Sequence, residues 1–151
     1  MRTYLVVVDE GEEARVALRF AARRAAKTGG AVDILTLIPP PEFVQWGGVQ
    51  AAMEEEARLR AEALVAQAAG ELIEETGLNP SITVRYGDPV EAVRAVLADR
   101  PETAALVMGA PASGTPGVLL TTIAGADAGR MPCPVMIIPG SLSDAALDRL
   151  S

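Results

Sequence analysis

Apolar and polar positions along the chain form two alternating patterns. Short apolar runs lie at residues 4–8, 32–38, 82–86, 104–108 and 134–138. The first and fourth runs are continuous, which is typical of central parallel strands that are buried on both faces. Longer segments with helical spacing separate the runs. This order predicts an α/β fold, a single open parallel five-stranded sheet with helices on both faces and right-handed crossovers.

The helices are predicted from apolar periodicity and from capping residues. Residues 12–27, 53–76 and 118–130 have helical spacing. Asp88 and Pro89 suit the cap and first position of a further helix, so Asp88 is interpreted as a cap and not as a catalytic acid. Ser143 can cap a short helix at residues 144–150. We predict one domain at residues 1–140, followed by a short tail at residues 141–151 with a helical segment.

The amino-acid composition excludes several kinds of catalysis and metal binding. The chain of 151 residues has no His, a single Cys (Cys133) and a formal charge of −7. These absences exclude Ser-His-Asp and Cys-His nucleophilic catalysis, His acid–base chemistry, the usual zinc sites and an intrachain disulfide. We therefore assign no catalytic residue and no metal site. Cys133 is interpreted as a structural thiol.

Net charge and hydropathy indicate which binding partners and which cellular location to expect. The acidic balance and the lack of a long basic run make nucleic acid an unfavourable partner. The apolar run near Met1 is too short for a signal peptide, and no run reaches the length of a membrane span. Together with the lone cysteine, these features favour a cytoplasmic protein.

Two features stand at the carboxyl ends of predicted strands, where ligands bind in sheets of this kind. Asp9 follows the first strand, and its carboxylate can accept hydrogen bonds from a nucleoside or cap the next helix. Residues 109–117 form a loop rich in both Gly and Pro. The loop suits an anion, but it has no Walker A or dinucleotide-binding pattern, and Pro111 and Pro116 remove N–H donors. An anion site and a simple connection both stay open.

Three stretches of the chain resemble the universal stress protein (UspA-like) family. Residues 5–9 and 17–21 are similar to its first strand, acidic residue and first helix. Residues 84–89 are similar to its Gly-Asp-Pro turn, and residues 106–109 and 131–138 to its last two strands. The resemblance implies an adenine nucleotide alpha hydrolase-like sheet of order 3-2-1-4-5, dimers formed through the last strand, and either an ATP-binding or a non-binding branch.

The resemblance also implies a nucleotide site whose phosphate motif is incomplete here. Gly109 matches the first Gly of the motif, Ala112 replaces the second, and Thr121 and Thr122 stand where Gly-Ser is expected, one position too close to Gly109. Residues 114–117 offer N–H groups in another register. The nucleoside half is better preserved, because Asp9 matches the acidic position and Ile38 the backbone position that holds the base.

These observations lead to a functional prediction with two alternatives. The leading reading is a cytoplasmic, homodimeric stress-response protein that acts by binding, with weak or no affinity for ATP, and whose protein partner is unknown. Val135, Met136, Ile137 and Ile138 form the expected dimer edge. The first alternative is a switch or slow ATPase that uses ATP with Mg²⁺. The second places an apolar contact surface at Phe43 and Trp46.

Overall fold

The sheet consists of parallel strands in the order β3-β2-β1-β4-β5, as predicted. The computed structural model describes residues 1–40 and 47–151, so the proposed contact residues Phe43 and Trp46 lie outside the described residues. The strands are β1 (Thr3–Val7), β2 (Ala31–Ile38), β3 (Ser81–Tyr86), β4 (Thr103–Ala110) and β5 (Val135–Pro139). Every pairing between neighbours is parallel, which leaves β3 and β5 as the two edges.

The central strand β1 divides the apolar core into two layers. Tyr4, Val6 and Val8 face one cluster of buried side chains, and Leu5 and Val7 face the other. This alternation follows from the pleat of a strand, which points successive side chains to opposite faces. The continuous apolar run of the sequence therefore reflects burial on both faces of the sheet.

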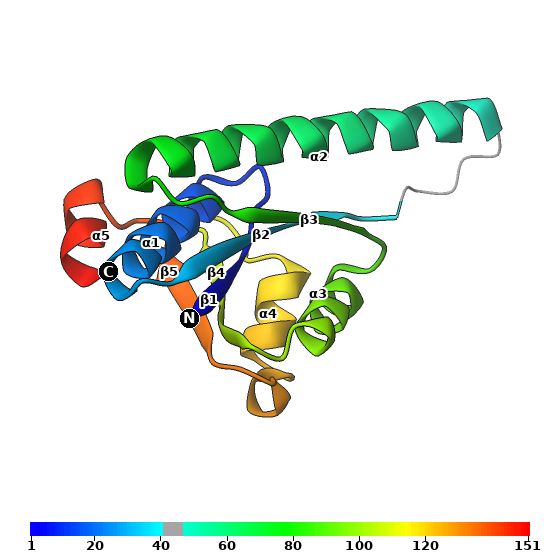
Figure 1. The fold of residues 1–151 in the computed structure, drawn as a ribbon. Helices are drawn as coiled ribbons and strands as arrows, with labels where there is room; N and C mark the ends of the chain where they lie inside the picture. Colours follow the sequence, from blue (N-terminus) through cyan, green and yellow to red (C-terminus); the bar gives the residue numbers. More distant parts are fainter. Residues whose placement is uncertain (41–46) are drawn as a thin grey trace.

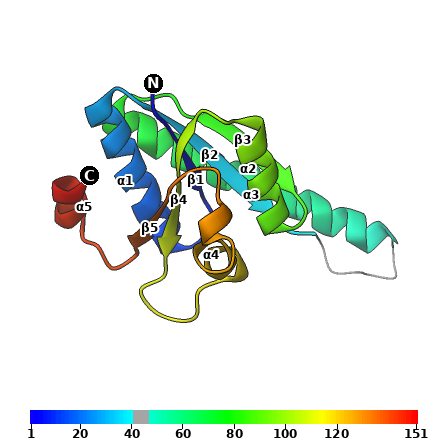
Figure 2. The ribbon, with the colours of Figure 1, turned by 90° about the horizontal axis from the view of Figure 1, so that it is seen from below.

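Helices cover both layers (Figures 1 and 2). Helices α1 (Glu12–Thr28) and α2 (Gly47–Thr76) pack on one face, and the short helix α5 (Asp144–Leu150) lies beside α1. Helices α3 (Pro89–Asp99) and α4 (Val118–Ala124) cover the other face. The side chain of Asp88 caps α3 and accepts a hydrogen bond from the N–H of Glu91 at 3.0 Å, as predicted.

The prediction of one helix over residues 118–130 is wrong. Helix α4 ends at Ala124, and a separate turn of 3₁₀-helix occupies Ala128–Arg130. A Cβ atom at Gly125 would lie 2.6 Å from the carbonyl oxygen of Thr121, so only glycine fits this bend. Beyond the bend, the buried carboxylate of Asp127 pairs with Arg94 of α3 and with Arg130. Apolar periodicity carries no signal for an ion pair between a helix and the turn that follows another helix.

The C-terminal helix forms as predicted and packs on the domain. The hydroxyl of Ser143 accepts a hydrogen bond from the N–H of Ala146 at 3.1 Å, which caps α5. Leu147 of α5 joins the core layer under α1 and α2. Among the helices that the structure describes, none combines the length and the hydropathy of a membrane span.

Candidate functional site

Asp9 stands where the carboxyl end of β1 turns into α1. Its Oδ1 atom accepts a hydrogen bond from the N–H of Gly11 at 2.8 Å, and Gly11, not Asp9, is the N-cap residue of α1. This turn orients the exposed carboxylate of Asp9 across the carboxyl edge of the sheet. Asp9 lines three neighbouring cavities, so it is the point at which they meet.

The first of these cavities is the β2–α2 groove, with a volume of about 980 Å³. Its wall is largely apolar and is formed by the end of β2 and by one side of α2: Leu37, Ile38, Met53, Ala57, Ala61 and Leu64. Thr36 lies in the same groove, and its hydroxyl donates to the carbonyl oxygen of Val8 at 3.2 Å. The groove therefore brings together Asp9 and Ile38, the two residues of the expected nucleoside half.

The rim of the β2–α2 groove carries polar groups. Ile38 itself is buried, and its carbonyl oxygen accepts a hydrogen bond from the N–H of Gly87 at 3.0 Å, which ties β2 to the turn after β3. Tyr86 precedes this glycine at the rim of the groove, and its side chain is 61% exposed. Arg60 is the basic member of the described lining, which also includes the acidic residues Asp9, Glu10, Glu54 and Glu56.

The second cavity is the β4–α4 pocket, which has a volume of about 200 Å³ and lies at the end of β4. Gly109 lines it together with Thr115 and Gly117 of the loop that leads into α4. Among the described residues of this lining, the charged members are Asp9 and Glu13, both acidic. A phosphate group in this pocket would meet negative charge without an opposing cation.

Helix–strand packing by itself requires glycine at position 109. A Cβ atom at this position would lie 2.1 Å from the backbone oxygen of Glu13, far inside van der Waals contact. The missing side chain allows the first turn of α1 to approach β4. Agreement with the first Gly of a phosphate motif is thus explained by helix–strand packing, with or without a ligand.

The structure does not bring Thr121 and Thr122 to the β4–α4 pocket. The hydroxyl of Thr121 bonds back to its own helix, where it donates to the carbonyl oxygens of Gly117 and Val118, each at 3.2 Å. Thr122 is half-buried, and neither threonine is among the described residues that line the pocket. The register through Thr115 and Gly117, which the sequence offered as an alternative, is the one that lies beside Gly109.

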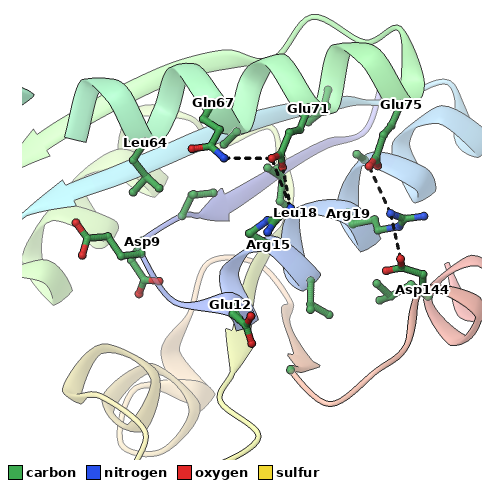
Figure 3. A pocket seen from close by; sticks show the side chains of 18 residues that line it. Asp9, Glu12, Arg15, Leu18, Arg19, Leu64, Gln67, Glu71, Glu75 and Asp144 are labelled. Atoms are coloured by element: carbon green, nitrogen blue, oxygen red, sulfur yellow. Dashed lines mark hydrogen bonds and ion pairs between the residues drawn. The ribbon is translucent and has the colours of Figure 1, made fainter. Parts of the chain in front are cut away.

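A third cavity of about 630 Å³, the α1–α2–α5 groove, lies on the other side of Asp9 (Figure 3). Arg15 of α1 faces Glu71 of α2 at 3.5 Å, and Arg19 lies 3.4 Å from Glu75 and 3.7 Å from Asp144 of α5. This groove was not predicted from the sequence. A signal was present, because the two cations and the two glutamates both recur every four residues and so form matching rows on two helices.

The structure also describes the surroundings of Cys133 and of the acidic side chains. Burial raises the pKa of the half-buried Cys133 thiol, against a smaller lowering by a hydrogen bond with the backbone of Leu106. A raised pKa keeps the sulfur protonated and weakly nucleophilic near neutral pH, which agrees with a structural thiol. In residues 1–40 and 47–151, no group of three or more His, Cys, Asp or Glu side chains has a geometry that could hold a metal ion.

Comparisons with known proteins identify the class. The universal stress protein family matches residues 1–139, and the chain belongs to this family. The universal stress protein UspA from Lactobacillus plantarum is 19% identical, with a TM-score of 0.76 over 91% of this chain and 97% of that one. No curated protein matches the chain.

Two further structures were solved with nucleotides. The universal stress protein from Archaeoglobus fulgidus in complex with dAMP is 21% identical, with a TM-score of 0.63 over 91% of this chain and 98% of that one. A universal stress protein in complex with cAMP is 22% identical, with a TM-score of 0.59 over 93% of this chain and 98% of that one. These likenesses confirm the predicted fold, and the family match over residues 1–139 confirms the predicted family.

Proposed function

We propose that this universal stress protein acts by binding, and that its β2–α2 groove takes the nucleoside part of an adenine nucleotide while ATP phosphates bind weakly or not at all. The observation that carries this proposal is the contrast between a large, mostly apolar groove that includes the cation Arg60 and a small pocket whose described charged lining, Asp9 and Glu13, includes no cation. The function is regulatory, and we assign no catalytic residue.

The nucleoside half is supported by what the groove contains. An adenine base needs apolar walls and a few placed polar groups. Leu64 and Ile38 contribute to the apolar wall of the groove, and Arg60 is a polar group at its edge. The carboxylate of Asp9 keeps an oxygen beyond the one bonded to Gly11 and can accept from ribose hydroxyls. Relatives in complex with dAMP and cAMP show that the family accommodates adenine nucleotides.

Phosphate groups should bind weakly in the β4–α4 pocket for electrostatic and geometric reasons. Asp9 and Glu13 would repel phosphate oxygens, and Pro111 has no N–H group to donate to them. The hydroxyl of Thr121, which stands at the motif position for a phosphate ligand, is already bonded to carbonyl oxygens of α4. A nucleotide bound here would gain little from its second and third phosphates.

A second candidate is an ATP-binding switch or slow ATPase, favoured by the position of Thr115 and Gly117 beside Gly109. In this case Mg²⁺ would offset the acidic lining, because carboxylates such as Asp9 and Glu13 are oxygen ligands of the kind that Mg²⁺ prefers. The two candidates differ in one measurable quantity, the ratio of the affinities for ATP and AMP.

Calorimetric titration of nucleotide-stripped protein with adenosine, AMP and ATP, each with Mg²⁺, separates these candidates. The proposal expects AMP and ATP to bind within about threefold of each other, since the extra phosphates add little. An ATP affinity more than about tenfold above that of AMP would instead favour the switch. Absence of heat with all three ligands would leave a binding protein that does not use nucleotides.

We propose further that the protein works in the cytoplasm as a homodimer paired through β5. This strand is an edge of the sheet, and Val135 and Met136 are half-buried while Ile137 is 42% exposed and Ile138 is buried. An apolar edge with free backbone groups suits a second copy. Light scattering should give a dimer mass that Ile137→Lys reduces to a monomer, whereas Ile82→Lys on the opposite edge strand β3 leaves it unchanged.

A further inference from the structure

The C-terminal helix α5 follows the part of the chain that matches the family. The match ends at residue 139, and α5 begins at Asp144 and packs against α1 (Figures 1 and 2). Among the residues of α5, all of which the structure describes, Leu147 is the buried one, with 1% of its surface exposed. Leu147 is therefore the single apolar anchor that holds α5 on the domain.

A row of cations on α1 holds the polar side of α5. Arg19, Arg23 and Lys27 recur every four residues and so share one side of the helix. Arg23 Nε lies 2.6 Å from Asp148 Oδ1, and Arg19 Nη2 lies 3.8 Å from the same oxygen. Lys27 Nζ donates to the backbone carbonyl oxygens of Asp148 and Ser151, each at 3.0 Å. We call these three residues the α1 cation row.

Apart from the buried Leu147, α5 has two weak features, its short length and its exposed ion pairs. A helix of seven residues is not stable by itself, because the cost of nucleation is not repaid over so short a length. The side chains of Asp144 and Asp148 are 76% and 45% exposed, so their ion pairs are screened by water and salt. We therefore expect α5 to detach far more often than the sheet opens.

Detachment would uncover a surface with defined chemistry. The socket of Leu147 would become an apolar depression bordered by the α1 cation row, on a protein whose net charge is −7. Arg19 joins this row to the α1–α2–α5 groove, which it also lines and where it pairs with Glu75 (Figure 3). Apolar anchors and opposite charge are what a groove needs to bind an amphipathic helix.

We infer that this surface of α1 is a docking site for an acidic amphipathic helix of another protein, and that α5 is its intramolecular occupant. Helix α5 shows the pattern that the surface recognises: Leu147 lies three positions after Asp144 and directly before Asp148. A partner helix with this pattern must displace α5 to bind. The inference concerns a surface apart from the proposed nucleoside groove and does not depend on it.

The test uses the full-length chain and a synthetic copy of the occupant. The probe is a fluorescent peptide with the sequence of residues 142–151, stapled between positions 145 and 149, which are exposed in α5. Leu147→Asp should release the internal helix, because a charge cannot enter the apolar socket. Fluorescence polarisation should then show at least about tenfold tighter binding of the peptide to Leu147→Asp than to the unaltered chain, where α5 competes.

Matched variants show which surface binds the peptide. Arg23→Glu in the Leu147→Asp background should weaken peptide binding at least about tenfold, because it reverses the central charge of the α1 cation row. Arg24→Glu makes the same charge change one position outside that row and should leave the affinity within about twofold. If Leu147→Asp does not fold, Asp148→Lys releases α5 by charge repulsion without altering the core.

Three results would overturn the inference. The first is a folded Leu147→Asp chain that does not bind the peptide. The second is equal affinity of the unaltered and the released chains, which would mean that α5 does not occupy the site. The third is a concentration-dependent dimer that Leu147→Asp abolishes, because the occupant would then be α5 of a second copy and not the helix of another protein.

Discussion

Two of the three cavities that Asp9 lines, the β2–α2 groove and the β4–α4 pocket, differ in size and in how apolar their walls are. The β2–α2 groove is large and is walled by aliphatic side chains of β2 and α2. The β4–α4 pocket is about one-fifth of its volume, 200 Å³ against 980 Å³, and its charged lining consists of Asp9 and Glu13. The first can hold a flat apolar base, whereas the second opposes an anion. The proposed function therefore treats nucleoside binding and phosphate binding as separable properties of this edge of the sheet.

The largest effect is expected from Gly109→Val, which tests whether this glycine serves packing or phosphate. The new side chain would collide with the backbone of Glu13, where even a Cβ atom would lie at 2.1 Å, and backbone cannot move aside as a flexible side chain does. We expect a loss of about 3 kcal/mol in the free energy of unfolding, measured by urea denaturation without nucleotide. Gly117→Ala is the control, because nothing lies within 4 Å of its added Cβ. A loss of equal size in the control would remove the packing explanation.

A smaller effect is expected from Asp9→Asn, which tests the nucleoside half. The amide keeps an oxygen that can accept from the N–H of Gly11, but it removes the charge that strengthens a hydrogen bond to a ribose hydroxyl. We expect AMP to bind about tenfold more weakly by calorimetry. Glu10→Gln, which changes the neighbouring acidic residue of the same groove, serves as the control for charge alone. Unchanged AMP affinity in Asp9→Asn would place the ribose elsewhere.

A gain in ATP affinity is expected from Glu13→Gln, which tests whether the two cavities act separately. Glu13 lines the β4–α4 pocket but is not among the described residues of the β2–α2 groove. Removing its charge should raise the affinity for ATP about threefold and leave that for adenosine unchanged. Equal shifts for both ligands would show that the cavities do not act separately.

The smallest effect is expected from Thr121→Val. Its hydroxyl bonds to two carbonyl oxygens of α4, so the substitution should change ATP affinity by less than about twofold and stability by less than about 0.5 kcal/mol. Thr115→Val is the informative partner, because Thr115 does line the β4–α4 pocket. A tenfold loss of ATP binding in Thr121→Val would restore the motif position as a phosphate ligand.

Local patterns were sufficient for most of the fold. Continuous apolar runs identified strands buried on both faces, and Asp88 with Pro89 marked the start of α3 because capping depends on residues close in sequence. The same reasoning failed at residues 118–130. There the decisive contacts are the carbonyl oxygen of Thr121 above Gly125 and the ion pair between Asp127 and Arg94, and the second joins residues 33 positions apart.

For the candidate site, too, some features could be predicted from the local sequence and others depended on tertiary packing. Residue order was enough to predict a parallel five-stranded sheet and to put Asp9 and Ile38 at its carboxyl edge, because strand ends are properties of short segments. The order of the strands in the sheet and the expectation of an altered phosphate motif came from the resemblance to the family. The packing of α1 against β4 decided that Gly109 is needed without any ligand, and the local hydrogen bonds of α4 decided that the hydroxyl of Thr121 is bonded to carbonyl oxygens of its own turn. The cation row under α5 likewise depends on two helices that meet only after the chain has folded.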